Sequence, residues 1–251
     1  MTSQDGTKKS GKSSRGRAAA IGLDKKQVVD AAIAQIDQKG FAAFSLRELA
    51  RTLGVSPAVI YWHVGGAKED LYAEISASLT GSLSEGLDAD MPWDERLRQV
   101  FRNYRTLVFR HHAVAPMLGA QLKSNGVANL DWVETILSAL HDGGYRGDAL
   151  RPAFNVLVGG LAGFVTMELA PAPVSKPASA GESWQELFAR RVAEIDPHLY
   201  PLTAAALPDI TNKIFVLRWH NGADVPYDDS YELLLDLLVE GLKARAPANP
   251  T

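Results

Sequence analysis

The chain has 251 residues, of which 46% are hydrophobic and 22% are charged, and none is cysteine. This composition is typical of a globular protein, and the length favours one small and one large domain. The lack of cysteine excludes disulfide bonds, thiolate metal sites and cysteine nucleophiles, and it fits a reducing compartment.

Charge is distributed unevenly along the chain. The segment from Met1 to Lys68 holds 11 Lys and Arg against 5 Asp and Glu, whereas the remainder holds 15 against 24. A basic front and an acidic rear indicate a module that meets a polyanion, joined to one that does not. Most of the basic excess lies in residues 1–22, which we expect to form a disordered tail. Whether this tail contacts the polyanion or only solubilises the protein stays open.

No membrane segment is expected. No apolar run follows the basic N-terminus, so we expect no secretory signal. The most apolar stretch, Ala153 to Met167, has 15 residues without a charge and is followed by Glu168. Because a bilayer span takes about 20 apolar residues, this stretch is predicted to be a buried core helix. The protein is therefore predicted to be cytoplasmic.

Two helices are predicted first, of which the second is short. One runs from an N-cap at Asp24 to Gly40, and the other begins with a capping box formed by Ser45 and Glu48 and stops at Gly54. Gln27, three residues after Asp24, supports the first N-cap. Phe44 and Leu49 occupy the positions of a hydrophobic staple around the start of the second helix.

A third helix is predicted from Ser56, as an N-cap, to about His63, with Pro57 at the first position, where its missing N–H costs nothing. Gly65-Gly66 breaks it, and a fourth helix starts near Ala67. Its inward side chains are predicted to be Leu71, Ile75, Leu79 and Leu83.

The rear of the chain is also helical in pattern. A long amphipathic helix follows Pro92, residues 170–182 are expected to be a mobile loop, and 197–227 is mixed. The other predicted helices are 114–122, 127–142, 148–169, 184–195 and 229–245. We therefore predict an all-α protein with a disordered tail (1–22), a helix-turn-helix domain (23–66) and a larger helical domain (67–247).

Two short helices around a glycine turn within residues 45–63 are the geometry that places one helix in the major groove of DNA, which is about 12 Å wide. Residues 24–83 closely resemble the DNA-binding domain of TetR-type (TetR/AcrR) repressors. The resemblance is carried by Phe44–Ala50, Leu53–Pro57, Ile60–Val64 and Lys68–Leu71. It covers about a quarter of the chain, and the rest matches only in the number, length and order of helices.

The resemblance implies a set of DNA contacts. Arg47 is expected on a base or phosphate, Pro57, Ala58 and Val59 against the groove, and Tyr61 and His63 on phosphates. The full predicted set is Ser45, Arg47, Ser56, Pro57, Ala58, Val59, Tyr61, His63 and Lys68. Gly65-Gly66-Ala67 is one residue longer than in many relatives, which puts the placement of Lys68 in doubt.

Each contact has a structural alternative. Ser45 is useful as a helix cap alone, Tyr61 could be half-buried, and His63 could be an ordinary surface histidine. Trp62 is predicted to pack in the core, between the first and fourth helices, and not on DNA.

For the rear domain, the resemblance implies dimerisation and effector binding. The helices at 148–169, where Gly159 and Gly163 leave a flat strip, and at 229–245 are predicted to form a four-helix interface between two copies. The alternative is that both are internal core. Two-fold symmetry would hold the recognition helices about 34–36 Å apart, which suits a palindromic operator.

The effector is predicted to be a largely apolar small molecule in an apolar pocket with a few polar groups. The candidate lining is Phe101, Tyr104, Met117, Trp132, Phe154, Met167 and Phe188. No cofactor or metal is expected: the adjacent His111 and His112 diverge on a helix and chelate poorly together.

The predicted function is a transcriptional repressor that an effector releases from its operator. The alternative is an activator, or a ligand-independent DNA-binding regulator, of the same fold. An enzyme is not expected, because no nucleophile–base pair, phosphate loop or metal-spaced histidine set is present in the sequence. Asp228, Asp229 and Glu232 stand at a helix start, where the helix dipole alone favours acids.

Overall fold

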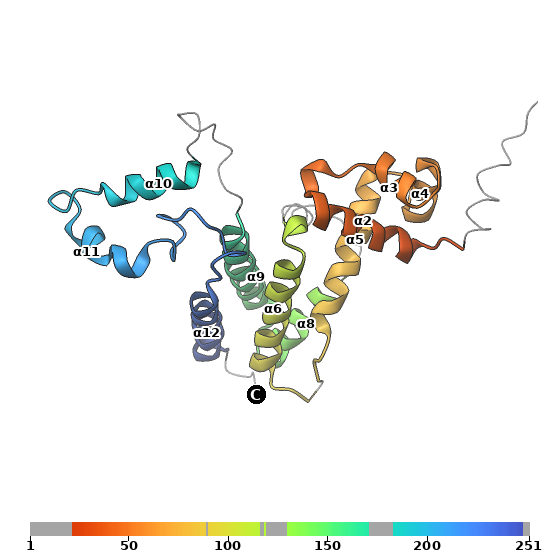
Figure 1. Ribbon diagram of the computed structural model, residues 1–251. Helices are drawn as coiled ribbons and strands as arrows, with labels where there is room; N and C mark the ends of the chain where they lie inside the picture. Colours follow the sequence, from red (N-terminus) through yellow and green to blue (C-terminus); the bar gives the residue numbers. More distant parts are fainter. Residues whose placement is uncertain (1–21, 89, 116–117, 119–129, 171–182, 248–251) are drawn as a thin grey trace, which may run out of the picture. The chain divides into compact units, whose positions relative to one another are not determined.

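The computed structural model describes residues 22–88, 90–115, 118, 130–170 and 183–247. All regular secondary structure in these ranges is helical (Figure 1), so the predicted all-α class is confirmed. By contact the chain divides into two compact units. The first is Met1–Ser82 with Pro116–Asn129, and the second is Leu83–Ala115 with Leu130–Thr251.

Four helices make up the described part of the first unit: α2 (Lys25–Lys39), α3 (Leu46–Thr52), α4 (Pro57–Val64) and α5 (Lys68–Thr80). Helix α5 packs on α2 and α4, so by contact it belongs to this unit, whereas the predicted domain boundary placed it in the rear. The core is formed by apolar side chains from all four helices. Its fully buried members include Val28, Ala32, Ile36, Leu49, Ile60, Leu71 and Ile75.

Local sequence signals account for where these helices begin. Asp24 accepts a hydrogen bond from the Gln27 backbone N–H at 2.7 Å, and the Gln27 side chain accepts one from Asp24 N–H at 2.9 Å. The predicted cap of α2 is thus confirmed. Ala67 at the start of α5 donates its N–H to the Asp70 carboxylate at 2.9 Å, which satisfies one of the free amides of that helix.

Two predicted caps differ in the structure. The Ser45 hydroxyl accepts from Glu48 N–H at 3.4 Å, but the Glu48 carboxylate does not reach back. It pairs with Lys39 and Arg51, because a cationic donor binds a carboxylate more strongly than a neutral amide N–H does. Ser56 occupies the N-cap of α4 with extended backbone, yet its side chain makes no cap hydrogen bond, so its hydroxyl is left for other partners.

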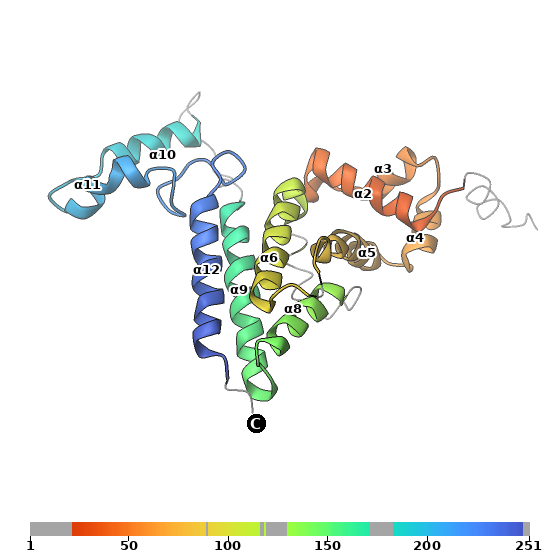
Figure 2. The same cartoon turned by 90° about the horizontal axis from the view of Figure 1, so that it is seen from below.

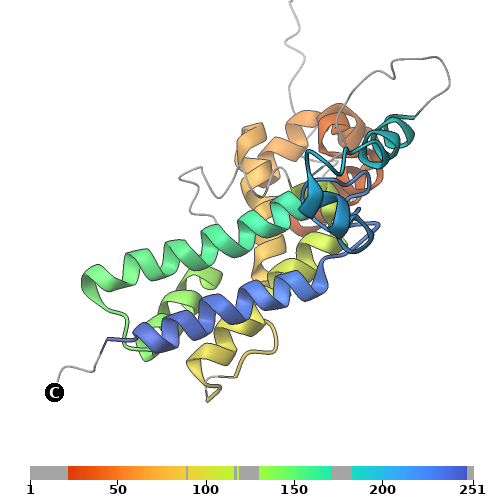
Figure 3. The same cartoon turned by 90° about the vertical axis from the view of Figure 1, so that its left-hand side faces the viewer.

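The second unit contains α6 (Trp93–Arg110), α8 (Asp131–Asp142), α9 (Leu150–Glu168), α10 (Trp184–Ala193), α11 (Pro201–Ile210) and α12 (Asp228–Arg245). Helices α6, α8, α9 and α12 pack on one another. Helices α9 and α12 lie side by side and run in opposite directions (Figures 2 and 3).

The helices predicted for the rear of the chain agree with the structure only in part. The helix expected at 127–142 begins at Asp131 within the described residues, and the one expected at 114–122 lies mostly outside them. Helix α11 was missed in the mixed segment 197–227. It begins with Pro201 at its first position and carries Pro208 in its last turn, so its prolines mark its ends rather than prevent it.

Helix α9 ends in a buried charge cluster. Glu168 has no exposed surface, and its carboxylate accepts two hydrogen bonds from Arg105 of α6, at 3.1 and 2.7 Å, and one from Tyr227 N–H at 2.7 Å. Its backbone carbonyl accepts from Gly222 N–H at 2.8 Å and from Arg218 at 2.9 Å. These bonds fix the segment that precedes α12 to the ends of α6 and α9.

The small size of Gly222 is required in this cluster. A side chain on Gly222 would overlap the Glu168 side chain and come close to its carbonyl oxygen. Glycine at this position therefore allows the loop backbone to lie directly against Glu168.

One stretch of the described residues, Gly147–Glu168, is long and apolar enough to cross a membrane by length and composition alone. A core helix of a soluble protein meets the same criterion. One side of α9 is indeed core, with Ala153, Leu157, Leu161 and Val165 buried. However, only 22% of its most apolar 18-residue window is buried in the protomer, so much of its apolar surface is uncovered.

Candidate functional site

The outward face of the helix-turn-helix is formed mainly by α4. Val59, Ile60 and Val64 fill its inward face, which leaves Ala58 and Trp62 on the opposite side. Arg47 on α3, and Ser56 and Pro57 at the start of α4, are also exposed, and Tyr61 is half-buried. These residues form one accessible surface that we call the outer face.

Trp62 was predicted to lie in the core, and this prediction is wrong. Its side chain is 69% exposed, and its ring meets the edge of the His63 ring at 4.7 Å between centroids. Helix α4 has only about two turns, and three aliphatic residues already fill its inward side. A large exposed aromatic beside Tyr61 adds apolar and stacking surface to the outer face.

Two predicted DNA contacts are less accessible than expected: Val59 is buried and His63 is half-buried. Val59 is 7% exposed and belongs to the core, so it does not face outward as expected. The Nε2 atom of His63 is buried and has no hydrogen-bond partner. Helical spacing accounts for both: positions 59 and 63 are four apart and share the inward-turned side of α4.

Lys68 is held close to the start of α3 despite the longer glycine turn before it. Its ammonium lies 5.9 Å from the centroid of the Phe44 ring and 5.3 Å from that of Tyr72. Hydrogen bonding to the Tyr72 side chain is the main cause that raises the pKa of Lys68. The residue is therefore a cation at any physiological pH, placed beside the residue that precedes Ser45.

The charges available to a polyanion follow from these contacts. Lys39 and Arg51 share the single carboxylate of Glu48, so together these three side chains contribute one positive charge. Arg47 is exposed, and Lys68 faces aromatic rings rather than a carboxylate. The outer face thus carries Arg47 as a cation with hydroxyl donors from Ser56 and Tyr61, and Lys68 and Ser45 add a second cation and hydroxyl outside it, at the starts of α5 and α3.

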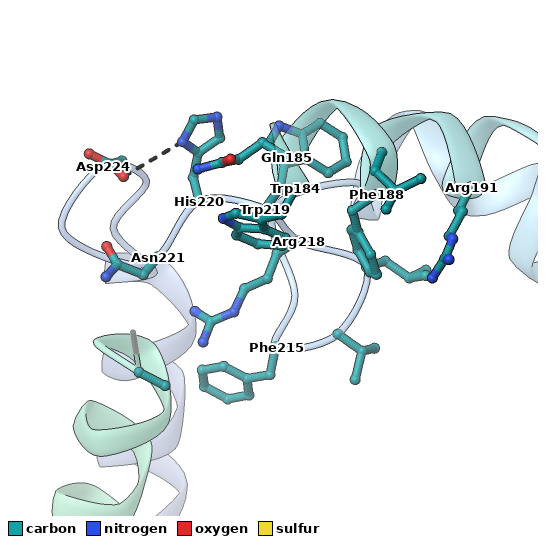
Figure 4. Close-up of a pocket in the computed structure, with 14 residues that line it drawn as sticks. Trp184, Gln185, Phe188, Arg191, Phe215, Arg218, Trp219, His220, Asn221 and Asp224 are labelled. Atoms are coloured by element: carbon teal, nitrogen blue, oxygen red, sulfur yellow. Dashed lines mark ion pairs between the residues drawn. The ribbon is translucent and has the colours of Figure 1, made fainter. Parts of the chain in front are cut away.

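The second unit holds a cavity of about 610 Å³ between α10 and the segment that precedes α12 (Figure 4). Its lining is aromatic with a few charged and polar groups. The residues are Ala170, Trp184, Gln185, Leu187, Phe188, Arg191, Phe215, Val216, Leu217, Arg218, Trp219, His220, Asn221 and Asp224.

Of the seven predicted pocket residues, only Phe188 lines this cavity. Phe101 is core, and its carbonyl accepts a hydrogen bond from the Tyr231 hydroxyl at 2.7 Å. Met167 is 52% exposed on α9, and Met117 lies outside the described residues. Burial raises the pKa of Tyr104 to about 12, so its hydroxyl stays neutral.

The two remaining predicted residues lie together elsewhere. The rings of Trp132 and Phe154 are 6.4 Å apart, and Phe154 borders a smaller and more open hollow of about 320 Å³ between α8 and α9. Sequence periodicity identified these residues as apolar helix positions, but it could not tell a core position from a cavity wall. Most of the residues that line the larger cavity come from the non-periodic segment 215–224.

Family comparison covers most of the chain. The family described as "Bacterial regulatory proteins, tetR family" matches residues 28–75, and the family described as "Tetracyclin repressor-like, C-terminal domain" matches residues 86–246. The chain belongs to the TetR family. It is a TetR-family transcriptional regulator with an N-terminal helix-turn-helix domain and a C-terminal helical domain, as its sequence predicted.

Individual relatives agree with this assignment. The HTH-type regulator BetI of Rhizobium meliloti is 42% identical over 67 residues, which is 27% of this chain and 32% of BetI. The class D tetracycline repressor of Escherichia coli is 26% identical over 129 residues, which is 49% of this chain and 56% of the repressor. The chain thus spans between a third and somewhat over half the length of these curated relatives.

Solved structures share the fold. ActR of Streptomyces coelicolor, in complex with actinorhodin, has a TM-score of 0.66 at 18% identity and covers 90% of this chain and 99% of its own. BioQ bound to its double-stranded DNA operator has a TM-score of 0.53 at 27% identity, over 59% of this chain and 87% of BioQ.

Proposed function

We propose that this regulator is a cytoplasmic, homodimeric repressor that binds a palindromic operator and is released by a small-molecule effector. The observation that carries the proposal is the outer face, where Ala58 and Trp62 of α4 and Arg47 of α3 are exposed and Tyr61 is half-buried, together with the exposed cation Lys68 at the start of α5. Hydroxyl and cationic groups suit phosphates, and the small and aromatic side chains suit base methyls and sugars. BioQ, a relative, has been solved on its operator, and another relative is named a repressor.

The DNA contacts that we propose are a revised set. Arg47, Ser56, Pro57, Ala58, Tyr61 and Lys68 are retained from the prediction, and Trp62 is added because of its exposure. Ser45 can both cap α3 and contact DNA, since its hydroxyl oxygen accepts from Glu48 N–H while its O–H remains a donor. If these groups meet phosphates, affinity for duplex DNA must fall steeply with salt concentration. A salt-independent affinity would contradict the phosphate contacts.

The dimer is supported by exposed apolar and glycine positions that recur along α9 and α12, which we call the strip. On α9, Val156 and Met167 are exposed, and a side chain added at Gly159 or Gly163 would meet nothing within 4 Å. On α12, Leu233 and Leu237 are exposed. An apolar strip of this length on both of two packed helices is unusual for a surface that stays in water. We propose that a second copy covers it and forms a four-helix interface.

Leu237→Glu tests this interface. We expect the dimer dissociation constant to rise at least about 100-fold, because each of two symmetry-related carboxylates would be buried without a partner. Operator affinity should fall with it, because a monomer presents a single recognition helix. Analytical ultracentrifugation and a gel-shift titration measure the two effects.

Leu130→Glu is the matched control for that variant. Leu130 is 54% exposed against 63% for Leu237, but it lies at the start of α8, outside the strip. The control should remain a dimer. Unchanged dimerisation of Leu237→Glu, or equal disruption by both variants, would contradict the proposed interface.

Release by an effector requires two states of the dimer with different spacing of the recognition helices. The effector must prefer the released state by several kcal/mol, since a ligand that binds both states equally shifts nothing. The cavity between α10 and residues 215–224 is the proposed effector site. Activation of transcription, or regulation without a ligand, remains the alternative function, because the sign of regulation depends on where the operator lies relative to the promoter.

The proposal includes no catalytic activity. The family consists of transcriptional regulators. Among the described residues no three His, Asp or Glu side chains gather as a metal site, and Asp228 pairs with Arg105 at 2.6 Å. Glu232 likewise pairs with Arg102 at 2.7 Å, so two of the three acids at the start of α12 have an arginine partner.

A further inference from the structure

The cavity in the second unit combines aromatic faces with two arginines. Trp184, Phe188 and Arg191 lie on α10, and Trp219 lies on the loop that precedes α12 (Figure 4). Phe215 and Arg218 of the same loop also line the cavity, with the Arg218 guanidinium turned toward the end of α9. Its volume, about 610 Å³, is that of a site for a small organic molecule. Such a site selects its ligand by the shape of the apolar walls and by a few charged groups.

The loop wall is pre-organised. Asn212 adopts a left-handed backbone conformation with φ of 61°, which asparagine tolerates better than most residues. Its side-chain oxygen accepts hydrogen bonds from the backbone N–H groups of Trp219 and His220, both at 3.0 Å. The backbone N–H of Asn212 donates to the Leu217 carbonyl at 2.9 Å. The Trp219 backbone is therefore fixed before a ligand arrives, which lowers the entropy lost on binding.

The same wall is anchored to the helices around it. The Tyr227 hydroxyl donates to the Ile214 carbonyl at 3.1 Å, and the Phe215 ring packs on those of Phe164 and Tyr227, at 4.9 and 5.4 Å between centroids. Arg218 donates to the Met167 and Glu168 carbonyls at the end of α9. These contacts hold the loop in one conformation against α9 and α12.

The charge balance of the cavity is positive. Asp224 is the only acid in its described lining, and His220 lies 3.6 Å from the Asp224 carboxylate. The partners of Arg218 are neutral: two carbonyl oxygens and the rings of Phe215 and Tyr227, each 5.8 Å from the guanidinium. Among the described residues, therefore, no carboxylate pairs with Arg218, and Arg191 adds a second cation.

We propose that this cavity binds a planar aromatic anion. The ring system lies among the Trp184, Phe188 and Trp219 side chains, and the anionic group faces Arg191 of α10. Aromatic faces stack on a planar ligand, and guanidinium groups bind carboxylates with two parallel hydrogen bonds. This inference rests on the proposed function in placing the effector here, and it replaces the largely apolar effector expected from sequence with a charged one.

The test uses two probes of the same shape, 2-naphthoate and the uncharged 2-naphthamide, titrated into the dimer by isothermal calorimetry. We expect naphthoate to bind at least about tenfold more tightly than naphthamide, because only the carboxylate gains charge-assisted hydrogen bonds. Arg191→Gln should weaken naphthoate binding by roughly three- to tenfold and leave naphthamide unchanged. Arg218 is unsuitable for this test, since it also caps α9.

Arg190→Gln is the matched control, with the same charge change one position earlier on α10, outside the cavity lining. It should leave naphthoate binding unchanged. Equal binding of the two probes, equal effects of the two variants, or no binding of naphthoate would overturn the inference. Operator binding by the same ligand-free samples is measured in parallel. If it persists, the proposed DNA-binding function stands even when the aromatic-anion inference fails.

Discussion

Ala58→Glu is expected to lower operator affinity by more than about 100-fold. Ala58 is exposed at the second position of α4, on the outer face. A carboxylate there meets the negative charge of the DNA, and like charges brought together at an interface cost several kcal/mol. A loss of about 1.5 kcal/mol of binding free energy at each of the two helix-turn-helix domains of a dimer corresponds to a decrease in affinity of that size. A gel-shift or fluorescence-anisotropy titration at fixed salt measures it.

The fold should tolerate this change, because an acidic side chain in the first turn of a helix is favoured by the helix dipole. Ser78→Glu is the control: it introduces the same carboxylate at an exposed position of α5, ten residues beyond Lys68 and outside the outer face. It should bind DNA nearly as well as the unchanged protein. Normal binding by Ala58→Glu would mean that α4 does not enter the groove.

Glu168→Ala is expected to cost about 3 kcal/mol of unfolding free energy, since it removes the buried partner of Arg105 and leaves that arginine with only the exposed Asp228. The change removes a carboxylate with no exposed surface and leaves Arg105, whose side chain is 15% exposed, without its buried partner. The Tyr227 N–H also loses its acceptor. Thermal or urea unfolding, at one fixed protein concentration, measures the effect.

Asp228→Ala provides the comparison, since Asp228 binds the same arginine at 2.6 Å but is 76% exposed. An exposed ion pair contributes about 0–1 kcal/mol, so this variant should unfold close to the unchanged protein. If the two variants destabilise equally, the buried cluster does not hold the end of α9, and the anchoring of the cavity wall to α6 would be wrong.

The front of the molecule was largely predictable from sequence because its signals are local. Asp24, Pro57 and the glycines at 40 and 54 set the ends of short helices through their own backbone and side-chain chemistry. On α5, the buried positions Leu71, Ile75 and Leu79 followed from helical spacing, whereas Leu83, predicted on the same helix, is buried in the 3-10 turn Gly81–Ser84 beyond its end. Trp62 was placed wrongly, because hydrophobicity favours burial, whereas the inward face of α4 was already occupied by Val59, Ile60 and Val64.

The cavity was not predictable in the same way. Its loop wall depends on Asn212, Gly222 and the carbonyl oxygens at the end of α9, which are brought together by contacts distant in sequence. The acid that anchors the wall, Glu168, was noted in the sequence only as the end of an apolar stretch. Long-range hydrogen bonds of this kind leave no periodic pattern along the chain.

Selection of bound sequences from a random duplex library, at moderate salt and with the purified protein, tests the central claim most directly. We predict enrichment of one palindrome whose half-sites lie about one helical turn apart, as two recognition helices of a symmetric dimer require. Enrichment of a single unpaired half-site, or of no sequence at all by a folded dimer, would contradict the proposed dimeric mode of operator binding.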